Sequence, residues 1–462
     1  NIFKKLSYTL FNHYLNSPIK LYYSKNSSEL LRNTLNECKN YGGLISNTLK
    51  LIVEILVSSF LFFLAIYINP LATLIIFFII IILVFFYYFF TKKKIYSFGL
   101  DRINKTQNQI KILQESFSGI RDIKLKSSEK FFSKLYDEAT HKFITAAYKQ
   151  QTIIDAPRYI LEFLFLSGLL FGMLILMNLN EDINSILPVI GLYIAISFKL
   201  IPGLMKILNI LQQIKHLEPS INVLNKEFSN LKNIKNDKVI NNNIEMGFNK
   251  QIKISNIDFS YMGEKKIFKN FSATIEKNSF VGIIGKSGSG KSTLIDLITG
   301  LIQPENGKIY IDEKNILTNL KKWQSKIGYV SQSVFLLDGT IKENIAFGIE
   351  KNNIDLDLIN KSLTYAKIDK FVKELNGGIN TIVGEKGVKI SGGQRQRIAI
   401  ARELYKQPEV LILDEATNAL DEETENEFLN FLDNLRGKIT IIISSHRPNS
   451  FKKCDKIIQL NN

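Results

Sequence analysis

The feature that most restricts the fold of this chain is a run of twenty residues, 71–90, that contains no charged side chain. Thr73 is its only residue that is neither aliphatic nor aromatic. A helix needs about 20 mostly apolar residues to cross a hydrocarbon core of about 30 Å. Each apolar residue favours insertion by about 0.3 to 0.6 kcal/mol, whereas one Lys at the helix centre costs about 3 kcal/mol. The run therefore predicts a membrane-spanning helix; a long helix buried in a soluble core is the alternative.

Three further runs are predicted to span the membrane, at 51–68, 159–177 and 186–204. The first is interrupted only by Glu54, and Asn69-Pro70 after it predicts a tight turn, so that 51–68 and 71–90 form a helical hairpin. Glu162 and Lys199 lie within the last two runs. Two readings of this pair stay open: the side chains line a polar path, or they extend their charged ends to the membrane interface.

Basic residues flank the predicted spans on one side only. They are Lys92, Lys93, Lys94, Arg158, Lys206 and Lys215, whereas the loop 178–185 holds Glu181 and Asp182 and no basic residue. The positive-inside rule places the basic ends, and with them both chain ends, in the cytoplasm. The net charge of +16 has two explanations, a nucleic-acid-binding surface or basic flanks of membrane helices, and the apolar runs favour the second.

The remaining segments predict a membrane domain at 1–227, a linker at 228–250 and a second domain at 251–462. The segments 11–40 and 91–157 are polar with helical periodicity, so they are expected to be cytoplasmic helices, with the second segment turning near 125–135. The linker is rich in Asn and Lys. From Gln251 onward short apolar strands alternate with helices, as in an α/β domain. The two cysteines, Cys38 and Cys454, are too few for a disulfide framework or a zinc site.

The segment 285–293 has the spacing of a phosphate-binding loop, Gly-x4-Gly-Lys-Ser-Thr, between an apolar strand pattern and a helical pattern. Glycines allow backbone N–H groups to close around phosphate oxygens, and a helix N-terminus adds positive potential. Lys291 is expected to reach the β- and γ-phosphates, and the Ser292 hydroxyl to bind Mg²⁺. The residues predicted to hold the nucleotide here are Gly285, Ser287, Gly288, Gly290, Lys291, Ser292 and Thr293. The sequence thus predicts binding of ATP with Mg²⁺.

Two other motifs fit the same site. The apolar stretch 410–413 ends in Asp414 and Glu415, where one acid can hold Mg²⁺ and the second can orient an attacking water. Ser391 and the glycines after it precede a helical pattern and predict a second anion-binding helix N-terminus. Because one nucleotide needs one phosphate cradle, the second cradle predicts ATP held between two copies of the domain; a glycine turn that caps a helix is the alternative.

With these motifs in this order, the chain resembles the ATP-binding cassette (ABC) transporters, specifically exporter-type half-transporters. The resemblance covers nearly the whole chain. Besides the phosphate loop and the acidic strand, it rests on Gln332 in Gly-Tyr-Val-Ser-Gln-Ser, the signature 390–394 with Ile390 where Leu is usual, Ala-Leu-Asp at 419–421, His446 in Ser-Ser-His-Arg, Tyr261 in Phe-Ser-Tyr, and Gly-Glu-Lys-Gly at 384–387.

The resemblance implies a role for each matched residue. Glu415 is expected to be the general base or to position water, His446 to contact the γ-phosphate, and Gln332 to contact Mg²⁺ or the water. Asp414 joins Ser292 and Gln332 as a metal-site residue. For Tyr261, stacking on adenine and packing in the core both stay open. Ser391 and Gly393 are expected to bind the γ-phosphate of the partner's ATP, and Gly392, Gln394 and Asp421 are also expected at the nucleotide.

The membrane domain resembles the family incompletely, since exporter halves have six spans and this sequence predicts four of them. The first residue is Asn1, and we expect the other two spans to lie upstream of it. Short helices that dock on the nucleotide domain are expected at 18–29 and 127–135. The fold class is therefore a partial α-helical membrane domain of ABC exporter type followed by an α/β P-loop domain.

The resemblance implies an ATPase that drives transport across a bacterial inner membrane, as a homodimer or with a paralogous half-transporter, and not a partner of nucleic acid. The segment 115–124 is similar to that of flippases for lipid-linked oligosaccharides, which makes an amphipathic or lipid-linked cargo the first expectation. Export of a peptide, toxin or drug is the alternative. A soluble DNA-associated ABC ATPase and a channel or receptor regulated by the cassette are two further alternatives.

Overall fold

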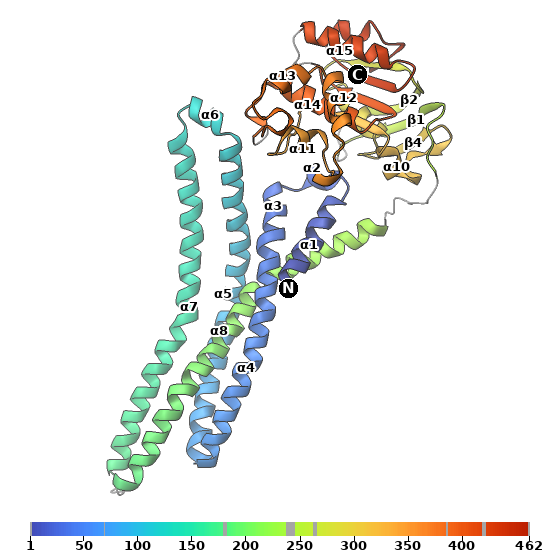
Figure 1. The fold of residues 1–462 in the computed structure, drawn as a ribbon. Coiled ribbons are helices and arrows are strands. Elements are labelled where there is room, and N and C mark those ends of the chain that lie inside the picture. Colours follow the sequence, from blue (N-terminus) through green and yellow to red (C-terminus); the bar gives the residue numbers. More distant parts are fainter. Residues whose placement is uncertain are drawn as a thin grey trace. The chain divides into compact units, whose positions relative to one another are not determined.

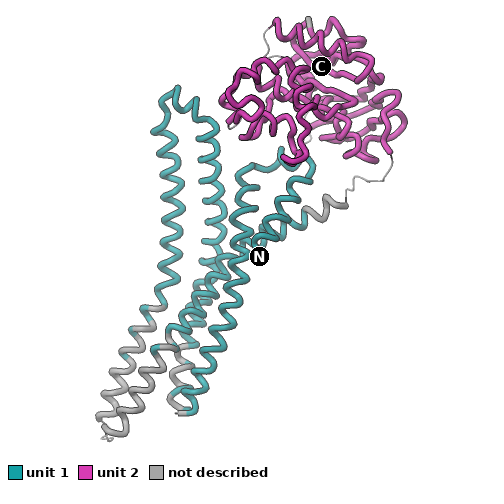
Figure 2. Tube along the Cα trace, in the orientation of Figure 1, with its two compact units in different colours: residues 1–236 teal, residues 237–462 magenta. Residues whose placement is uncertain are grey.

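The structure is a computed structural model that describes residues 2–68, 70–178, 183–236, 245–261, 266–384, 387–417 and 422–460. The chain divides into two compact units, 1–236 and 237–462 (Figure 2). The first unit is helical and the second is built on β-sheets (Figure 1).

The first unit consists of long helices connected by short ones (Figure 1). Its helices are α1 (Ile2–Leu15), α2 (Lys20–Ser24), α3 (Ser27–Arg32), the π-helix η1 (Asn33–Glu37), α4 (Cys38–Ile68), α5 (Pro70–Ser118), α6 (Ile120–Leu125), α7 (Glu129–Asn178) and α8 (Ile183–Asn236). Helix α4 packs on α8, and α5 packs on α7 and α8. Pro70 suits the first position of α5, because the N–H group that it lacks has no partner inside a helix there.

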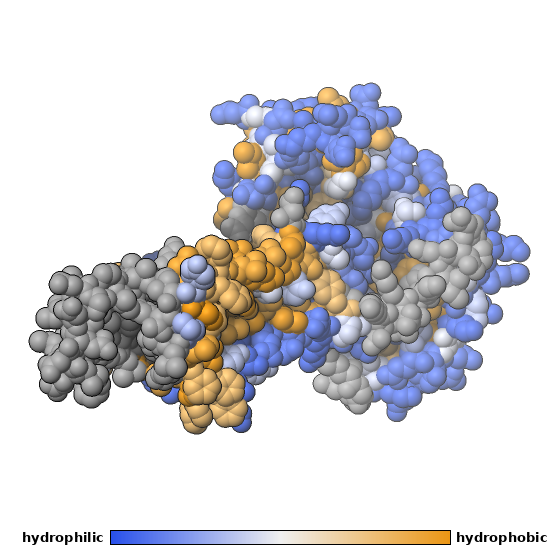
Figure 3. Space-filling view, turned by 90° about the horizontal axis from the view of Figure 1, so that it is seen from below, coloured by the Kyte–Doolittle hydropathy of each residue, from blue (hydrophilic) through white to orange (hydrophobic). Residues whose placement is uncertain are grey.

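One helical stretch in the described part of the chain, Ser27–Tyr67, has the length and hydropathy to cross a membrane. Its apolar side chains face outward: Leu56, Phe60, Phe63 and Tyr67 are all exposed. Figure 3 shows such side chains as a continuous apolar surface on the helices. The backbone is helical at 71–90, 159–177 and 186–204, but these ranges include side chains outside the described residues, so their membrane crossing stays a prediction.

The short helix expected at 127–135 is not found there, and docking on the second domain stays a prediction. The short helix between the two long ones is α6, at Ile120–Leu125, and α7 begins at Glu129. Helix α5 ends at Ser118, before Gly119, whose φ and ψ of −95° and 16° leave the helical region. Ser127, with a φ of +51°, then separates α6 from α7. Hydrophobic periodicity carries no signal for these two backbone changes. The other predicted docking segment, 18–29, contains a short helix, α2.

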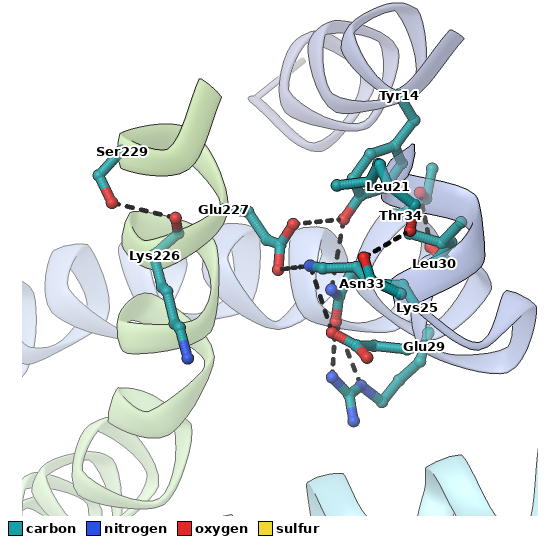
Figure 4. Close-up of polar contacts among 12 residues, drawn as sticks. Tyr14, Leu21, Lys25, Glu29, Leu30, Asn33, Thr34, Lys226, Glu227 and Ser229 are labelled. Carbon is teal, nitrogen blue, oxygen red and sulfur yellow. Dashed lines mark hydrogen bonds and ion pairs between the residues drawn. The ribbon is translucent and has the colours of Figure 1, made fainter. Parts of the chain in front are cut away.

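A polar network with a buried carboxylate joins α1, α3, η1 and the C-cap of α2 to the last part of α8 (Figure 4). The Glu227 carboxylate accepts a hydrogen bond of 3.1 Å from the Tyr14 hydroxyl and pairs with Lys25. Lys25 also lies 3.3 Å from a Glu29 oxygen, and Asn33 donates to the Tyr14 hydroxyl over 3.3 Å. The buried Glu227 carboxylate thereby joins α8 to Lys25, which lies 202 residues earlier in sequence.

The π-helix η1 adds a second network next to the first. Arg32 and Glu37 stand five residues apart, a spacing that places side chains on different faces of an α-helix. In η1 their charged groups meet, with the Nε of Arg32 3.8 Å from Oε1 of Glu37. Arg102 of α5 lies 3.4 Å from the other Glu37 oxygen, and Ser220 of α8 donates to that oxygen over 2.7 Å. The π-turn thus brings one buried carboxylate to three helices.

The second unit contains two sheets. Its antiparallel sheet has the order β2-β1-β4-β5 and its parallel sheet the order β6-β7-β8-β3-β9. The strands are β1 (Gln251–Phe259), β2 (Phe268–Glu276), β3 (Phe280–Gly285), β4 (Asn306–Ile311), β5 (Lys314–Asn315), β6 (Ile327–Val330), β7 (Val410–Asp414), β8 (Thr440–Ser444) and β9 (Lys456–Leu460). The central strands β7 and β8 are buried along their whole length, as expected for parallel strands covered on both faces.

Helices surround the parallel sheet and complete the core. They are α9 (Lys291–Ile298), α10 (Leu320–Gln324), α11 (Ile341–Ile345), α12 (Leu356–Tyr365), α13 (Asp369–Glu374), α14 (Gly392–Tyr405) and α15 (Glu422–Leu435), with 3-10 turns at Ile316–Thr318, Lys351–Asn353, Gly378–Asn380 and Pro448–Phe451. Buried apolar side chains form two clusters, one including Ile398, Leu411 and Phe428 and the other Ile252, Leu294 and Ile412.

The segment with linker composition, 228–250, is structured over much of its length. Helix α8 continues to Asn236, and the side chains of Met246 and Phe248 are buried in the core of the second unit. Residues 237–244 lie outside the described residues. The predicted boundaries at 227 and 250 stay a prediction.

Candidate functional site

The phosphate-loop motif lies between β3 and α9, as its spacing predicts. Gly288 and Gly290 have φ values of +78° and +96°, which other residues rarely adopt. A Cβ at Gly290 would also stand 2.6 Å from a methyl carbon of Ile267, so a side chain there would clash. The two glycines therefore allow the chain to curl tightly at the N-terminus of α9.

The polar groups of this loop suit an anionic ligand. The Lys291 side chain is 6% exposed, and its ammonium donates to the carbonyl oxygens of Gly285 and Lys286 at 3.0 and 3.4 Å. Within the described residues no carboxylate pairs with this ammonium, and the buried Ser289 hydroxyl has no hydrogen-bond partner. Ser287 and Ser292 are exposed on the loop. A buried cation and an unsatisfied hydroxyl at a helix N-terminus fit a phosphate group.

Three residues predicted to be catalytic meet at a single carboxylate. The Nε2 of Gln332 donates to Oε2 of Glu415 over 2.8 Å, and Nε2 of His446 lies 2.9 Å from Oε1. Gln332 follows β6, Glu415 follows β7, and His446 follows β8, and these strands are neighbours in the parallel sheet. Their carboxyl ends therefore lie along one edge, where α/β sheets bind ligands.

Glu415 adopts an uncommon backbone conformation, with a φ of +51°. Its N–H group donates to both the carbonyl and the hydroxyl oxygen of Ser444, each at 3.1 Å. Ser444 in turn donates its hydroxyl proton to Oδ1 of Asp414 over 2.6 Å. A non-glycine residue in the left-handed region is held there by its surroundings, and such residues cluster at functional sites. Ser444 is the first residue of the motif Ser-Ser-His-Arg, but no role was predicted for it from the sequence.

Asp414 is buried and fits one ligand of a Mg²⁺ site. Mg²⁺ is usually held by one or two carboxylates, substrate phosphates and water, so a set made of Asp414, Ser292 and Gln332 suits it. Asp296 of α9 faces the same place: burial, and then the charge of Asp414, raise the pKa of Asp296 to about 6. Asp296 was not predicted as a site residue. Its sequence signal is its position one helical turn after Ser292.

Ser391 is the N-cap of α14 and forms a capping box with Gln394. The Ser391 hydroxyl accepts from the Gln394 N–H over 3.3 Å, and the Gln394 side chain accepts from the Ser391 N–H over 2.8 Å. Ser391 is exposed and the two glycines after it are half-buried. Both hydrogen bonds of this cap lie within residues 391–394. Its role toward a partner's nucleotide stays a prediction.

Tyr261 packs its ring edge-to-face on Phe259, with 5.0 Å between ring centres, and its hydroxyl lies 3.4 Å from that of Thr293. The side chain is half-buried, so packing and adenine stacking both remain open for it. Asp421, together with the rest of 419–421, and Glu385 and Lys386 of the motif 384–387 lie outside the described residues.

Known protein families match both units. The family described as "ABC transporter transmembrane region" matches residues 1–198. The family described as "ABC transporter" matches residues 268–418. The first match contradicts the alternative of a soluble DNA-associated ATPase. A bacterial Atm1-family ABC exporter with ATP bound has a similar structure: the TM-score is 0.79 at 22% identity, over 99% of this chain and 81% of that chain.

Curated relatives match over slightly less than half of this chain. ABC transporter B family member 21 of Arabidopsis thaliana is 43% identical over 209 residues, which are 45% of this chain and 16% of that protein. A putative export ATP-binding/permease protein of Rickettsia prowazekii is 42% identical over 216 residues, which are 46% of this chain and 37% of that protein. A multidrug resistance ABC transporter ATP-binding and permease protein of Lactococcus lactis is 41% identical over 210 residues, which are 45% of this chain and 35% of that protein. The matched part thus spans well under half the length of these relatives.

Proposed function

We propose that the chain is one half of an ATP-driven exporter, in which a transmembrane region of ABC transporter type is followed by one ATP-binding domain. The observation that carries the proposal is the meeting of Gln332 and His446 at the carboxylate of Glu415. This arrangement supplies a base and two groups that orient it, next to a loop that fits phosphate.

The chemistry is hydrolysis of the bond between the β- and γ-phosphates of ATP. A water attacks the γ-phosphorus, the bond to the ADP oxygen breaks, and Glu415 accepts the proton that the water loses. Gln332 and His446 hold the two carboxylate oxygens, and a neutral imidazole with its proton on Nε2 donates to Oε1. Lys291 neutralises the β- and γ-phosphates.

Ser292, Asp414 and Gln332 are the residues that would hold Mg²⁺. When bound, the ion neutralises phosphate charge as it develops on the leaving group. The Ser444 hydroxyl, which donates to Asp414 and accepts from the Glu415 N–H, fixes the two acids relative to each other. Asp414 would thereby bind the metal while Glu415 would activate the water.

Two copies of the chain, or this chain and a paralogous half-transporter, would enclose the nucleotides. The exposed cap at Ser391, with Gly392, Gly393 and Gln394, is suited to bind phosphate from a second copy. ATP then stabilises the closed pair only if it binds that state more tightly than the open one. The short helices α2 and α6, on the cytoplasmic side of the membrane, would transmit this closure to the membrane helices.

For the cargo we place an amphipathic or lipid-linked substrate first and a peptide, toxin or drug second. The segment 115–124 that supports the first choice lies at the end of α5 and in α6, at the opposite end of α5 from Pro70 (Figure 1). It therefore does not line the predicted spans, which leaves the choice to experiment. The relative from Lactococcus lactis is a multidrug resistance transporter, which supports the second choice.

The test is reconstitution of the protein into liposomes with a fluorescent lipid-linked sugar, and separately with a fluorescent peptide. We expect ATP-dependent movement of the lipid-linked sugar that is absent in Lys291→Ala. Stimulation by the peptide alone would reverse the order of the cargoes. ATP-independent flux that Glu415→Gln leaves unchanged would indicate a channel regulated by the cassette and would contradict an exporter.

A further inference from the structure

A buried carboxylate on α15 holds the turn that carries His446. Glu425 is 3% exposed, and the turn after β8 contains two equally buried hydroxyls, Ser445 and Ser450. Glu425 lies twenty-one residues before His446 in sequence and on a different element. None of the sequence motifs includes it.

The contacts of Glu425 bracket His446 on both sides. Its Oε2 pairs with Nη1 of Arg447, and its Oε1 accepts from the Ser450 hydroxyl over 3.0 Å. The Ser450 oxygen lies 3.1 Å from that of Ser445, and Ser445 accepts from the Arg447 N–H over 3.0 Å. The residues immediately before and after His446 are thus tied, directly or through Ser450, to one carboxylate.

The imidazole of His446 has little else to hold it. Its side chain is 46% exposed, and in the described part of the chain its polar partner is Glu415. The position of the imidazole therefore depends on the backbone of its turn. Only the Glu425 end of this ion pair is buried, since the Arg447 side chain is 37% exposed, so the pair adds little net stability and its main effect is to select one geometry of that turn.

We propose that Glu425 is a positioning residue of the nucleotide site, which acts by holding the His446 turn in register with Glu415. This inference rests on the proposed function, since His446 matters here through ATP hydrolysis. Loss of the ion pair would let the turn move. Small displacements of a catalytic group lower the rate of the chemical step strongly, while the phosphate loop, which binds the nucleotide, would be unaffected.

The experiment compares Glu425→Gln with the wild-type full chain in ATP hydrolysis. Gln keeps the size of the side chain and an acceptor for Ser450, but it cannot pair with Arg447 as an ion. We expect kcat to fall by about 10- to 100-fold with KM for ATP within about twofold of wild type. The matched control is Glu427→Gln, an exposed carboxylate on the same helix, which should leave both constants unchanged.

A double variant separates positioning from general damage. In a His446→Ala background, Glu425→Gln should cause no further loss, because the group that it positions is already absent. A further loss there, a rise in KM alone, or a wild-type kcat for Glu425→Gln would overturn the positioning role. If the wild-type chain hydrolysed ATP no faster than Lys291→Ala, the proposed function would be overturned, and this inference with it.

Discussion

The Nε2 atom of His446 lies 2.9 Å from Oε1 of Glu415. The two residues follow neighbouring strands, β8 and β7, and Asp414 is paired in register with Ser444 just before them. The contact is therefore built into the parallel sheet, and each side chain lies within a few residues of a buried strand. This relationship yields the first prediction.

Glu415→Gln is expected to lower kcat for ATP hydrolysis by about 100-fold or more, because an amide cannot accept the proton of the attacking water. ATP binding should be retained, since the phosphate loop is unchanged. Hydrolysis and binding of a fluorescent ATP analogue measure the two effects. Glu409→Gln, next to the other end of β7, is the control. With hydrolysis blocked and Mg-ATP saturating, the protein should associate in pairs; a strictly monomeric protein would contradict the two-copy site.

Lys291→Ala should weaken nucleotide binding by about 10- to 100-fold, which corresponds to loss of a charge-assisted hydrogen bond of about 1.5 to 3 kcal/mol. Hydrolysis should fall to background. Lys286→Ala, which removes an exposed lysine of the same loop, serves as the comparison and should bind normally. Unchanged ATP turnover in Lys291→Ala would refute the assignment of the loop.

Asp296→Asn is expected to stabilise the protein at high pH. Burial and Asp414 raise the pKa of Asp296 to about 6, so the folded chain favours the protonated form. The stability from this preference is complete below the unfolded pKa of about 4 and is lost as the pH rises through about 6. Allowing for partial exposure, the variant should gain about 1 kcal/mol at pH 8 and little at pH 4. Thermal unfolding without Mg²⁺ measures this difference, and equal shifts at both pH values would contradict it.

Lys25→Met should destabilise the helical unit by about 3 kcal/mol, because it leaves the buried carboxylate of Glu227 without its cationic partner. Thermal unfolding in detergent is the measurement, and Lys226→Met, which removes an exposed lysine next to Glu227, is the control. The double variant Lys25→Met with Glu227→Gln should recover part of the loss. If the two substitutions were additive, the pair would not be coupled.

The sequence predicted those parts of the site that depend on local spacing. The phosphate loop needs glycines at fixed intervals before a helix, and the second anion-binding helix N-terminus needs Ser391 and two glycines before a helical pattern, so both are visible in short segments. The meeting of Gln332, Glu415 and His446 depends on strand order, which no short segment encodes. Their place in one site was predicted through the family resemblance, and the structure brings them together.

What sequence reasoning missed is tertiary or depends on single backbone angles. Glu425 looks like any surface acid near the start of an acidic helix, and only the packing of α15 on the turn after β8 buries it. Gly119 and Ser127 end α5 and α6 through backbone angles that hydrophobic periodicity does not report. Helix α8 continues to Asn236, into a segment whose Asn- and Lys-rich composition predicts a linker.

The π-turn at Asn33–Glu37 makes the helical unit sensitive to chain length as well as to side-chain chemistry. Such a turn accommodates one residue more than an α-helical turn, so everything before it is rotated by about 100° relative to a regular helix. Deleting one of these five residues would restore the regular winding and swing Arg32 away from Glu37. The preceding short helices would then meet α5 and α8 with the wrong faces, although almost no side chain had been removed.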